Sequence, residues 1–161
     1  LETSQQTFTP DNTKRMSGMF VRAYFRRAGI IALLSLISAV IVYFAVYMLS
    51  KYSSVLMLSG VLDNQVTHMV FIIGLISYAG LSFALMNAVV LFSLSQLEMV
   101  NQSILPALLV NLVMGFVLSR WIEYHYAVFG LLAGTIIFMV LSGLKVVKVM
   151  GNIDYYLYAA S

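Results

Sequence analysis

Residues 28–50, AGIIALLSLISAVIVYFAVYMLS, form an apolar run without a single charged side chain. A second uncharged run covers residues 69–95, and shorter runs follow at 104–119 and 127–144. A helix rises about 1.5 Å per residue, so about 20 apolar residues cross the roughly 30 Å hydrocarbon core of a membrane. The two long runs have this length, and the two short runs reach it when flanking residues are included. The run that starts at residue 127 can extend to residue 150 if its lysines reach out of the bilayer.

The composition of the chain also indicates that these runs lie in lipid. The chain is 61% hydrophobic and 9% charged, whereas a soluble domain has about 25% charged residues. The runs do not alternate between polar and apolar residues, and an open sheet in lipid would leave backbone groups without hydrogen-bond partners. The sequence therefore predicts an all-α integral membrane protein, a bundle of four transmembrane helices.

Three regions are expected from the change in composition along the chain. Residues 1–27 form a polar segment and a basic juxtamembrane helix, residues 28–150 form the transmembrane region, and residues 151–161 form a short cytoplasmic tail. The basic segment includes Arg22, Arg26 and Arg27. It is interpreted either as an ordinary juxtamembrane anchor or as a contact for anionic lipid headgroups or an anionic substrate.

The positive charges predict the orientation in the membrane. The chain has nine lysines and arginines, and all except Lys51 and Arg120 precede residue 28 or follow residue 144. Four crossings place both of these ends on one side, and cytoplasmic flanks are enriched in lysine and arginine. We therefore predict a multi-pass protein of the cytoplasmic (inner) membrane with both ends of this segment in the cytoplasm.

A few polar side chains fall at membrane depth, and two roles are open for them. Asn87, Asn111 and Tyr78 either form hydrogen bonds that hold helices together or line a polar path for a substrate. No charged residue lies near the centre of a predicted helix, which argues against a proton pump or voltage sensor built from these helices.

Gly130 and Gly134 form a G-x-x-x-G pattern in the last predicted helix. Such spacing permits two helix backbones to approach closely. These glycines are predicted to act in helix packing.

The polar stretch SRWIEYHY contains Arg120, Glu123 and His125 among aromatic residues. Arg120 and Glu123 are spaced for an ion pair, and an aromatic, hydrogen-bonded cap at the outer interface is the expected structure. The spacing matches no metal-ligand motif, and the chain has no cysteine, no G-x-S-x-G and no paired carboxylates. The sequence therefore predicts no enzyme activity, no metal and no cofactor.

A resemblance to a known family adds to this interpretation. The basic flank YFRRAG, the stretch YHYAVFGLLAGTIIFMVLSGLKVV and the tail NIDYYLYAAS resemble the carboxyl-terminal part of polysaccharide flippases in the multidrug/oligosaccharidyl-lipid/polysaccharide exporter superfamily. Within this superfamily the chain is most similar to the Pel exopolysaccharide transporter family, over residues 20–158.

The resemblance implies a transporter with twelve or more helices in two inverted halves, which moves its substrate by alternating access. Four helices would then be the last part of a larger transporter, whose partners are membrane lipid, the remaining helices and a polysaccharide or lipid-linked sugar, but no nucleic acid. Asn87, Asn111 and Tyr78 would line the substrate path. The alternative is a small four-helix membrane subunit that assembles with other membrane proteins through the Gly130 and Gly134 face and has a structural role.

Overall fold

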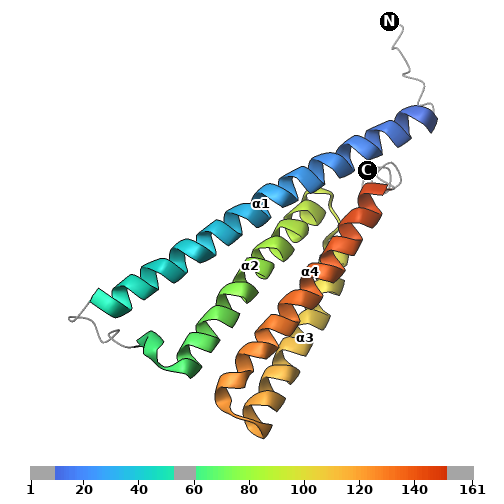
Figure 1. Cartoon of the computed structure of the whole chain (residues 1–161). Helices are drawn as coiled ribbons and strands as arrows, with labels where there is room; N and C mark the ends of the chain where they lie inside the picture. The colour runs from blue at the N-terminus through green and yellow to red at the C-terminus, as the bar shows by residue number, and fades with distance from the viewer. Residues whose placement is uncertain (1–9, 53–60, 152–161) are drawn as a thin grey trace, which may run out of the picture.

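The computed structural model describes residues 10–52 and 61–151, which form helices and short turns without a β-strand. Figure 1 shows the four α-helices: α1 (Pro10–Tyr52), α2 (Gln65–Ser93), α3 (Leu97–Trp121) and α4 (Ala127–Gly151). Two short 3-10 helices, η1 (Val61–Asp63) and η2 (Tyr124–Tyr126), precede α2 and α4.

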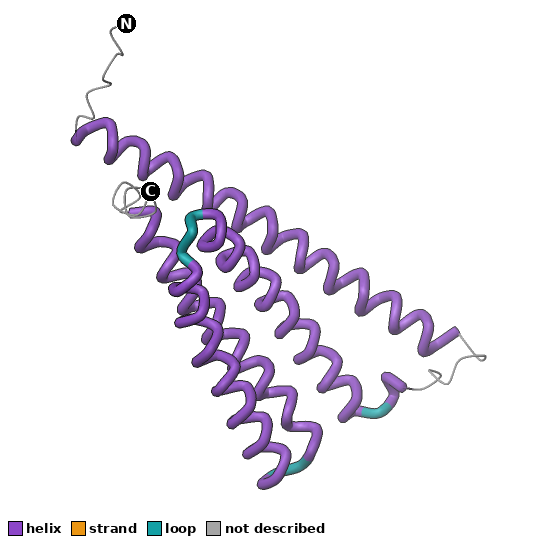
Figure 2. The backbone as a smooth tube through the Cα atoms, turned by 180° about the vertical axis from the view of Figure 1, so that it is seen from behind, coloured by secondary structure: helices purple, strands orange, loops and turns teal. Residues whose placement is uncertain are grey.

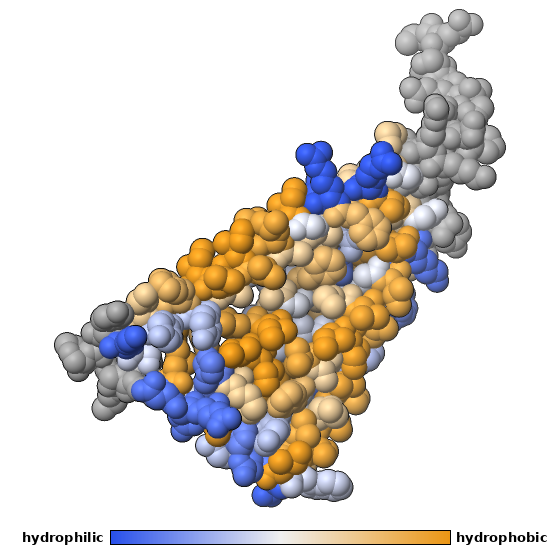
Figure 3. Space-filling view, viewed as in Figure 1, coloured by the Kyte–Doolittle hydropathy of each residue, from blue (hydrophilic) through white to orange (hydrophobic). Residues whose placement is uncertain are grey.

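Four stretches are long and apolar enough to cross a membrane; the first three lie within α1, α2 and α3, and the fourth consists of η2 and α4. These stretches are Val21–Lys51, Gln65–Ser93, Leu97–Trp121 and Tyr124–Gly151. Figure 3 shows a broad band of hydrophobic side chains across the visible face, with hydrophilic side chains gathered at its two ends. The prediction of an all-α, four-helix membrane bundle is confirmed, and the exposed apolar surface of its helices contacts membrane lipid.

Helix α1 is longer than the sequence predicted. It has 43 residues, which corresponds to about 65 Å, and it continues without a break through residue 27, where a boundary was expected. Proline is tolerated in the first turn of a helix, and after Pro10 no further proline interrupts α1. Residue 27 therefore marks a change of composition but not a change of backbone structure, while residues 1–9 and 152–161, including the predicted tail beyond Gly151, lie outside the described residues.

Local hydrogen bonds define two of the helix ends. The side-chain oxygen of Asn64 accepts a hydrogen bond from the backbone N–H of Val66 at 2.9 Å, which caps the start of α2. At the end of α2 the N–H of Gln96 bonds to the carbonyl oxygen of Leu91 at 2.9 Å, and Ser95 adopts a left-handed conformation with φ of 59°. This tight turn leads directly into α3.

The four helices are arranged like a fan. Figures 1 and 2 show that they gather at the end where α1 begins and α4 finishes, and that they spread apart at the opposite end. Helix α3 packs most extensively on α4, α4 packs on α2, and α1 contacts mainly α2. The buried core lies largely at the gathered end, with Ala88 and Leu91 from α2, Val100 from α3, and Val146 and Val149 from α4.

Candidate functional site

A chain of buried hydrogen bonds joins α1, α2 and α4 at the gathered end of the bundle. The hydroxyl group of Tyr24 donates to the Oδ1 atom of Asn87 at 2.6 Å, and the Nδ2 atom of Asn87 donates to the Oγ atom of Ser142 at 3.1 Å. Asn87 and Ser142 are fully buried. The side chain of Asn87 thus has a partner on each side, as a buried amide requires, and its contacts hold helices together.

The G-x-x-x-G glycines of α4 lie against the backbone of α3. A methyl group on Gly130 would come within 2.5 Å of the Gly115 nitrogen and 2.8 Å of the Asn111 carbonyl oxygen. On Gly134 it would lie 2.8 Å from the Ala107 carbonyl oxygen. The structure therefore places both glycines in a contact between two helices of the same chain, and the face that the subunit alternative assigned to an outside partner is already covered by α3.

The three residues expected to line a substrate path do not come together. Asn87 is enclosed between α1, α2 and α4, whereas Asn111 packs against Gly134 between α3 and α4. Tyr78 is 63% exposed on α2. A shared path along these three side chains has no counterpart in the arrangement of the helices, because they face three different surroundings.

Cavities follow one another along the seam between α1 and α2. At the gathered end a cavity of about 630 Å³ is lined by Tyr24 and Arg27 from α1 and by residues of α2 from Ser82 onward. Further along both helices is an apolar cavity of about 470 Å³, lined by Leu36, Ala39, Val40, Tyr43, Ile72, Leu75, Ile76 and Ala79. It lies on the other side of the contact between α1 and α2, because Leu36 and Arg27 point in opposite directions from α1, about half a turn apart. The seam is therefore apolar in its middle.

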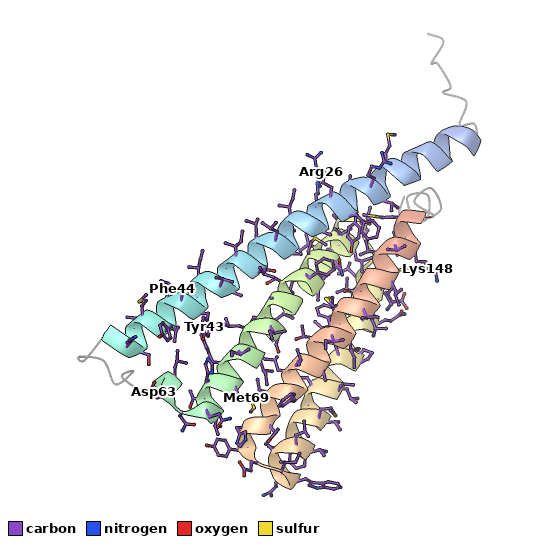
Figure 4. All side chains as sticks on the ribbon, viewed as in Figure 1. Arg26, Tyr43, Phe44, Asp63, Met69 and Lys148 are labelled. Carbon is purple, nitrogen blue, oxygen red and sulfur yellow. The ribbon has the colours of Figure 1, made fainter. Side chains whose placement is uncertain are left out.

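The far end of this seam carries a polar pocket of about 520 Å³, which we call the polar end pocket. It is lined by Tyr43, Tyr47, Ser50, Lys51, Leu62, Asp63 and His68. The hydroxyl of Tyr43 lies 3.0 Å from the Nε2 atom of His68, and Figure 4 shows Tyr43 on α1 above η1, where Asp63 lies. Acceptor, donor and aromatic groups thus converge on one pocket, which is typical of a ligand site.

Sequence patterns did not single out the polar end pocket. Tyr43 and Tyr47 belong to the first apolar run, whereas Asp63 and His68 lie in a separate segment of the chain. One feature of the sequence does indicate the pocket. The end of the first apolar run and the start of the second must reach the same membrane surface, so the polar residues at these two ends are expected to be neighbours.

The three arginines of the basic flank differ in their surroundings. Arg22, Arg26 and Arg27 are all exposed on α1. Only Arg27 lines one of the cavities described above, and Figure 4 shows Arg26 pointing away from the other helices. Of the three predicted anionic contacts, Arg27 is therefore the one that borders a cavity described here.

A lysine at the end of α4 is bound to the start of α3. The Nζ atom of Lys145 donates to the carbonyl oxygen of Met99 at 3.0 Å and to Oε1 of Gln102 at 3.2 Å. Gln102 in turn donates to Glu98 at 3.1 Å. These contacts join the end of α4 to the first turns of α3, which lie before the predicted apolar run at residues 104–119.

An aromatic cluster occupies the turn between α3 and α4. Glu123 pairs with His125 at 3.1 Å rather than with Arg120, which the sequence spacing had suggested. The His125 ring lies 4.5 Å from that of Tyr126, which stacks on Phe129 at 5.8 Å. Among the described residues no group of three or more His, Cys, Asp or Glu side chains could hold a metal ion.

The pair of Glu123 and His125 is expected to contribute little to stability. Glu123 is 65% exposed, and exposed ion pairs contribute from about 0 to 1 kcal/mol. Replacing Glu123 with glutamine should therefore change the free energy of unfolding in detergent by less than about 1 kcal/mol. A much larger loss in a denaturant titration would mean that the turn depends on this pair.

No protein family, no curated protein and no solved structure matches this chain.

Proposed function

We propose that the chain is part of a membrane transporter that exports or flips a polysaccharide or lipid-linked sugar across the cytoplasmic membrane by alternating access. The observation that carries this proposal is the polar end pocket at the spread end of the bundle. The similarity of the flank YFRRAG and of residues 124–147 to polysaccharide flippases of the Pel exopolysaccharide type supports the substrate class.

The chemistry of the polar end pocket suits a sugar. The carboxylate of Asp63 accepts hydrogen bonds, and Lys51 donates them. The ring of Tyr47 lies 5.9 Å from the Nζ atom of Lys51, and tyrosine offers both an apolar face and a hydroxyl group. Hydroxyl-rich molecules need such a mixture of acceptors, donors and flat apolar surfaces.

The orientation follows from the distribution of basic residues. Arg22, Arg26 and Arg27 lie in the first turns of the first membrane-crossing stretch, and Lys145 and Lys148 lie near the end of the last one. Because basic residues concentrate on the cytoplasmic side, the gathered end of the bundle would face the cytoplasm and the polar end pocket would face outward. The remaining helices of the transporter would then cover apolar surface of this bundle.

Replacing Asp63 with asparagine tests the proposal in cells that produce the polysaccharide. Asparagine keeps an acceptor oxygen but removes the charge, and a neutral hydrogen bond contributes about 1–1.5 kcal/mol less than a charged one. Export should therefore fall by about fivefold to tenfold at unchanged abundance of the protein in the membrane. The matched control is Tyr78→Phe, which removes an exposed hydroxyl group outside the pocket and should leave export within about twofold, since no pocket contact is lost.

The opposite results would remove the transport proposal. Unchanged export in a variant that combines Asp63→Asn with Tyr47→Ala, at normal abundance, would show that the pocket does not handle the substrate. If deletion of the protein lowers the abundance of other membrane proteins while export by the remaining machinery continues, the structural subunit becomes the better description.

A further inference from the structure

The apolar cavity and the polar end pocket meet at Tyr43, which lines both of them. Their lining residues on α1 recur every three or four positions, so they share about a third of the helix circumference at 3.6 residues per turn. These residues are Leu36, Ala39, Val40, Tyr43, Tyr47, Ser50 and Lys51. The lining residues on α2 follow the same spacing: His68, Ile72, Leu75, Ile76 and Ala79. The two cavities therefore form one continuous groove between α1 and α2, which we call the amphipathic groove.

The amphipathic groove has the depth of one membrane leaflet. On α1 it runs from Lys51, the last residue of the membrane-crossing stretch Val21–Lys51, to Leu36 in the middle of that stretch. Ala79, at the apolar end on α2, is likewise the middle residue of Gln65–Ser93. The rise from Leu36 to Lys51 is about 22 Å, and half of a bilayer with its headgroups measures about 20–22 Å. A lipid with its headgroup at Lys51 would therefore end its chains near Leu36.

The apolar part of the groove is accessible from the hydrocarbon of the membrane. The side chains of Leu36, Val40 and Ile76 that line it are exposed. Tyr43 brings the one hydroxyl group among its lining residues, and this group lies 3.0 Å from Nε2 of His68. The surface left for a ligand between Tyr43 and Leu36 is thus hydrocarbon, which suits an acyl chain.

The polar part of the groove carries one charge of each sign. Lys51 and Asp63 both line it, and neither forms an ion pair within residues 18–52 and 62–151. A phosphate group accepts charge-assisted hydrogen bonds from a lysine, and a primary ammonium group donates them to a carboxylate. A headgroup with a negative charge alone would satisfy Lys51 but would be repelled by Asp63. Charge complementarity therefore favours a zwitterionic headgroup that contains both a phosphate and a primary ammonium group.

We propose that the amphipathic groove binds one phosphatidylethanolamine molecule from the leaflet at the spread end of the bundle. Its phosphate group contacts Lys51, its ammonium group contacts Asp63, and one acyl chain lies between Ala39 and Ala79. This proposal goes beyond the transport function, because it concerns the polar end pocket in the absence of a sugar. Lipid retention is measured on the purified protein without export, so the two proposals can fail separately.

Native mass spectrometry of the detergent-purified protein provides the first test. With phosphatidylethanolamine and phosphatidylglycerol of identical chains, we expect phosphatidylethanolamine to be retained about fivefold more strongly. Asp63→Asn should abolish this preference, because it weakens the bond to the ammonium group and removes the repulsion of phosphatidylglycerol. Lys51→Gln should weaken the retention of both lipids by about fivefold, since both contain the phosphate group.

Two exposed charges at the same end of the bundle supply matched controls. Glu123→Gln and Arg120→Gln remove the same charges outside the groove and should change retention by less than about twofold. Equal retention of both lipids by the unchanged protein, or a preference that survives Asp63→Asn, would overturn the proposal.

Two substitutions of alanine test the acyl-chain part of the groove. Ala39→Phe fills the apolar cavity and should reduce phosphatidylethanolamine retention by at least about fivefold, whereas Ala45→Phe, on an exposed part of α1 outside the groove, should leave it unchanged. Helix content by circular dichroism shows whether each variant is folded. Equal retention in the two folded variants would contradict the proposed chain position.

A cross-link identifies the occupant in native membranes. The chain has no cysteine, so Ala79→Cys labelled with a benzophenone maleimide places one photoreactive group in the groove. Its lipid adducts should be richer in phosphatidylethanolamine than those of Ala45→Cys, which samples the surrounding lipid. Equal lipid composition at the two positions, or an adduct with another protein or a further helix of a larger transporter, overturns the proposal.

Discussion

Replacing Gly130 with alanine is expected to separate α3 from α4 and to lower the free energy of unfolding by at least about 2 kcal/mol. The added methyl group would come within 2.5 Å of the Gly115 nitrogen, 2.7 Å of its Cα atom and 2.8 Å of the Asn111 carbonyl oxygen. These atoms belong to backbone and cannot turn aside as a side chain would. The loss should be measured by unfolding the purified protein in mixed micelles with increasing sodium dodecyl sulfate, followed by circular dichroism.

A second glycine serves as the control for this experiment. Gly74 lies in α2, and a methyl group there would meet no atom within 4 Å. Alanine is favoured over glycine in a helix by about 0.5–1 kcal/mol, so Gly74→Ala should leave stability unchanged or raise it slightly. If both variants behave alike, the close contact of α3 and α4 does not stabilise the bundle.

Replacing Asn87 with leucine is expected to lower the free energy of unfolding by about 1–3 kcal/mol. Leucine removes the acceptor of the Tyr24 hydroxyl group and the donor to Ser142. Tyr24 is only 6% exposed, so its hydroxyl group would lose its partner in a buried position. The same unfolding titration measures this loss, and the exposed Asn101→Leu is the matched control with an expected change below about 0.5 kcal/mol.

A double-mutant cycle separates the hydrogen bond from simple packing. Removing both partners of a buried hydrogen bond costs less than leaving one unpaired. The combination of Tyr24→Phe and Asn87→Leu should therefore be less destabilising than the sum of the single changes, by about 0.6–1.7 kcal/mol. Strict additivity would show that the bond between Tyr24 and Asn87 contributes nothing and that α1 is held to α2 by apolar contacts alone.

The sequence determined the number of crossings and the secondary structure. An apolar run of the length of residues 28–50 has only one way to satisfy its backbone in lipid, and a helix does so whatever surrounds it. The helix ends were less well predicted, because they depend on contacts that hydropathy does not describe. Asn64 caps α2 through its side chain, and Lys145 of α4 bonds to the Met99 carbonyl oxygen in the first turn of α3.

Only the tertiary structure decided which side chains form a site. Asn87 and Tyr78 are both polar residues of α2, but one is fully buried while the other is 63% exposed. Gly74 and Gly130 are both helical glycines, but only Gly130 touches a neighbouring backbone. A helix that is apolar on all sides has no periodicity that marks its inner face, so these differences, and the meeting of Tyr43 with His68, follow from packing alone.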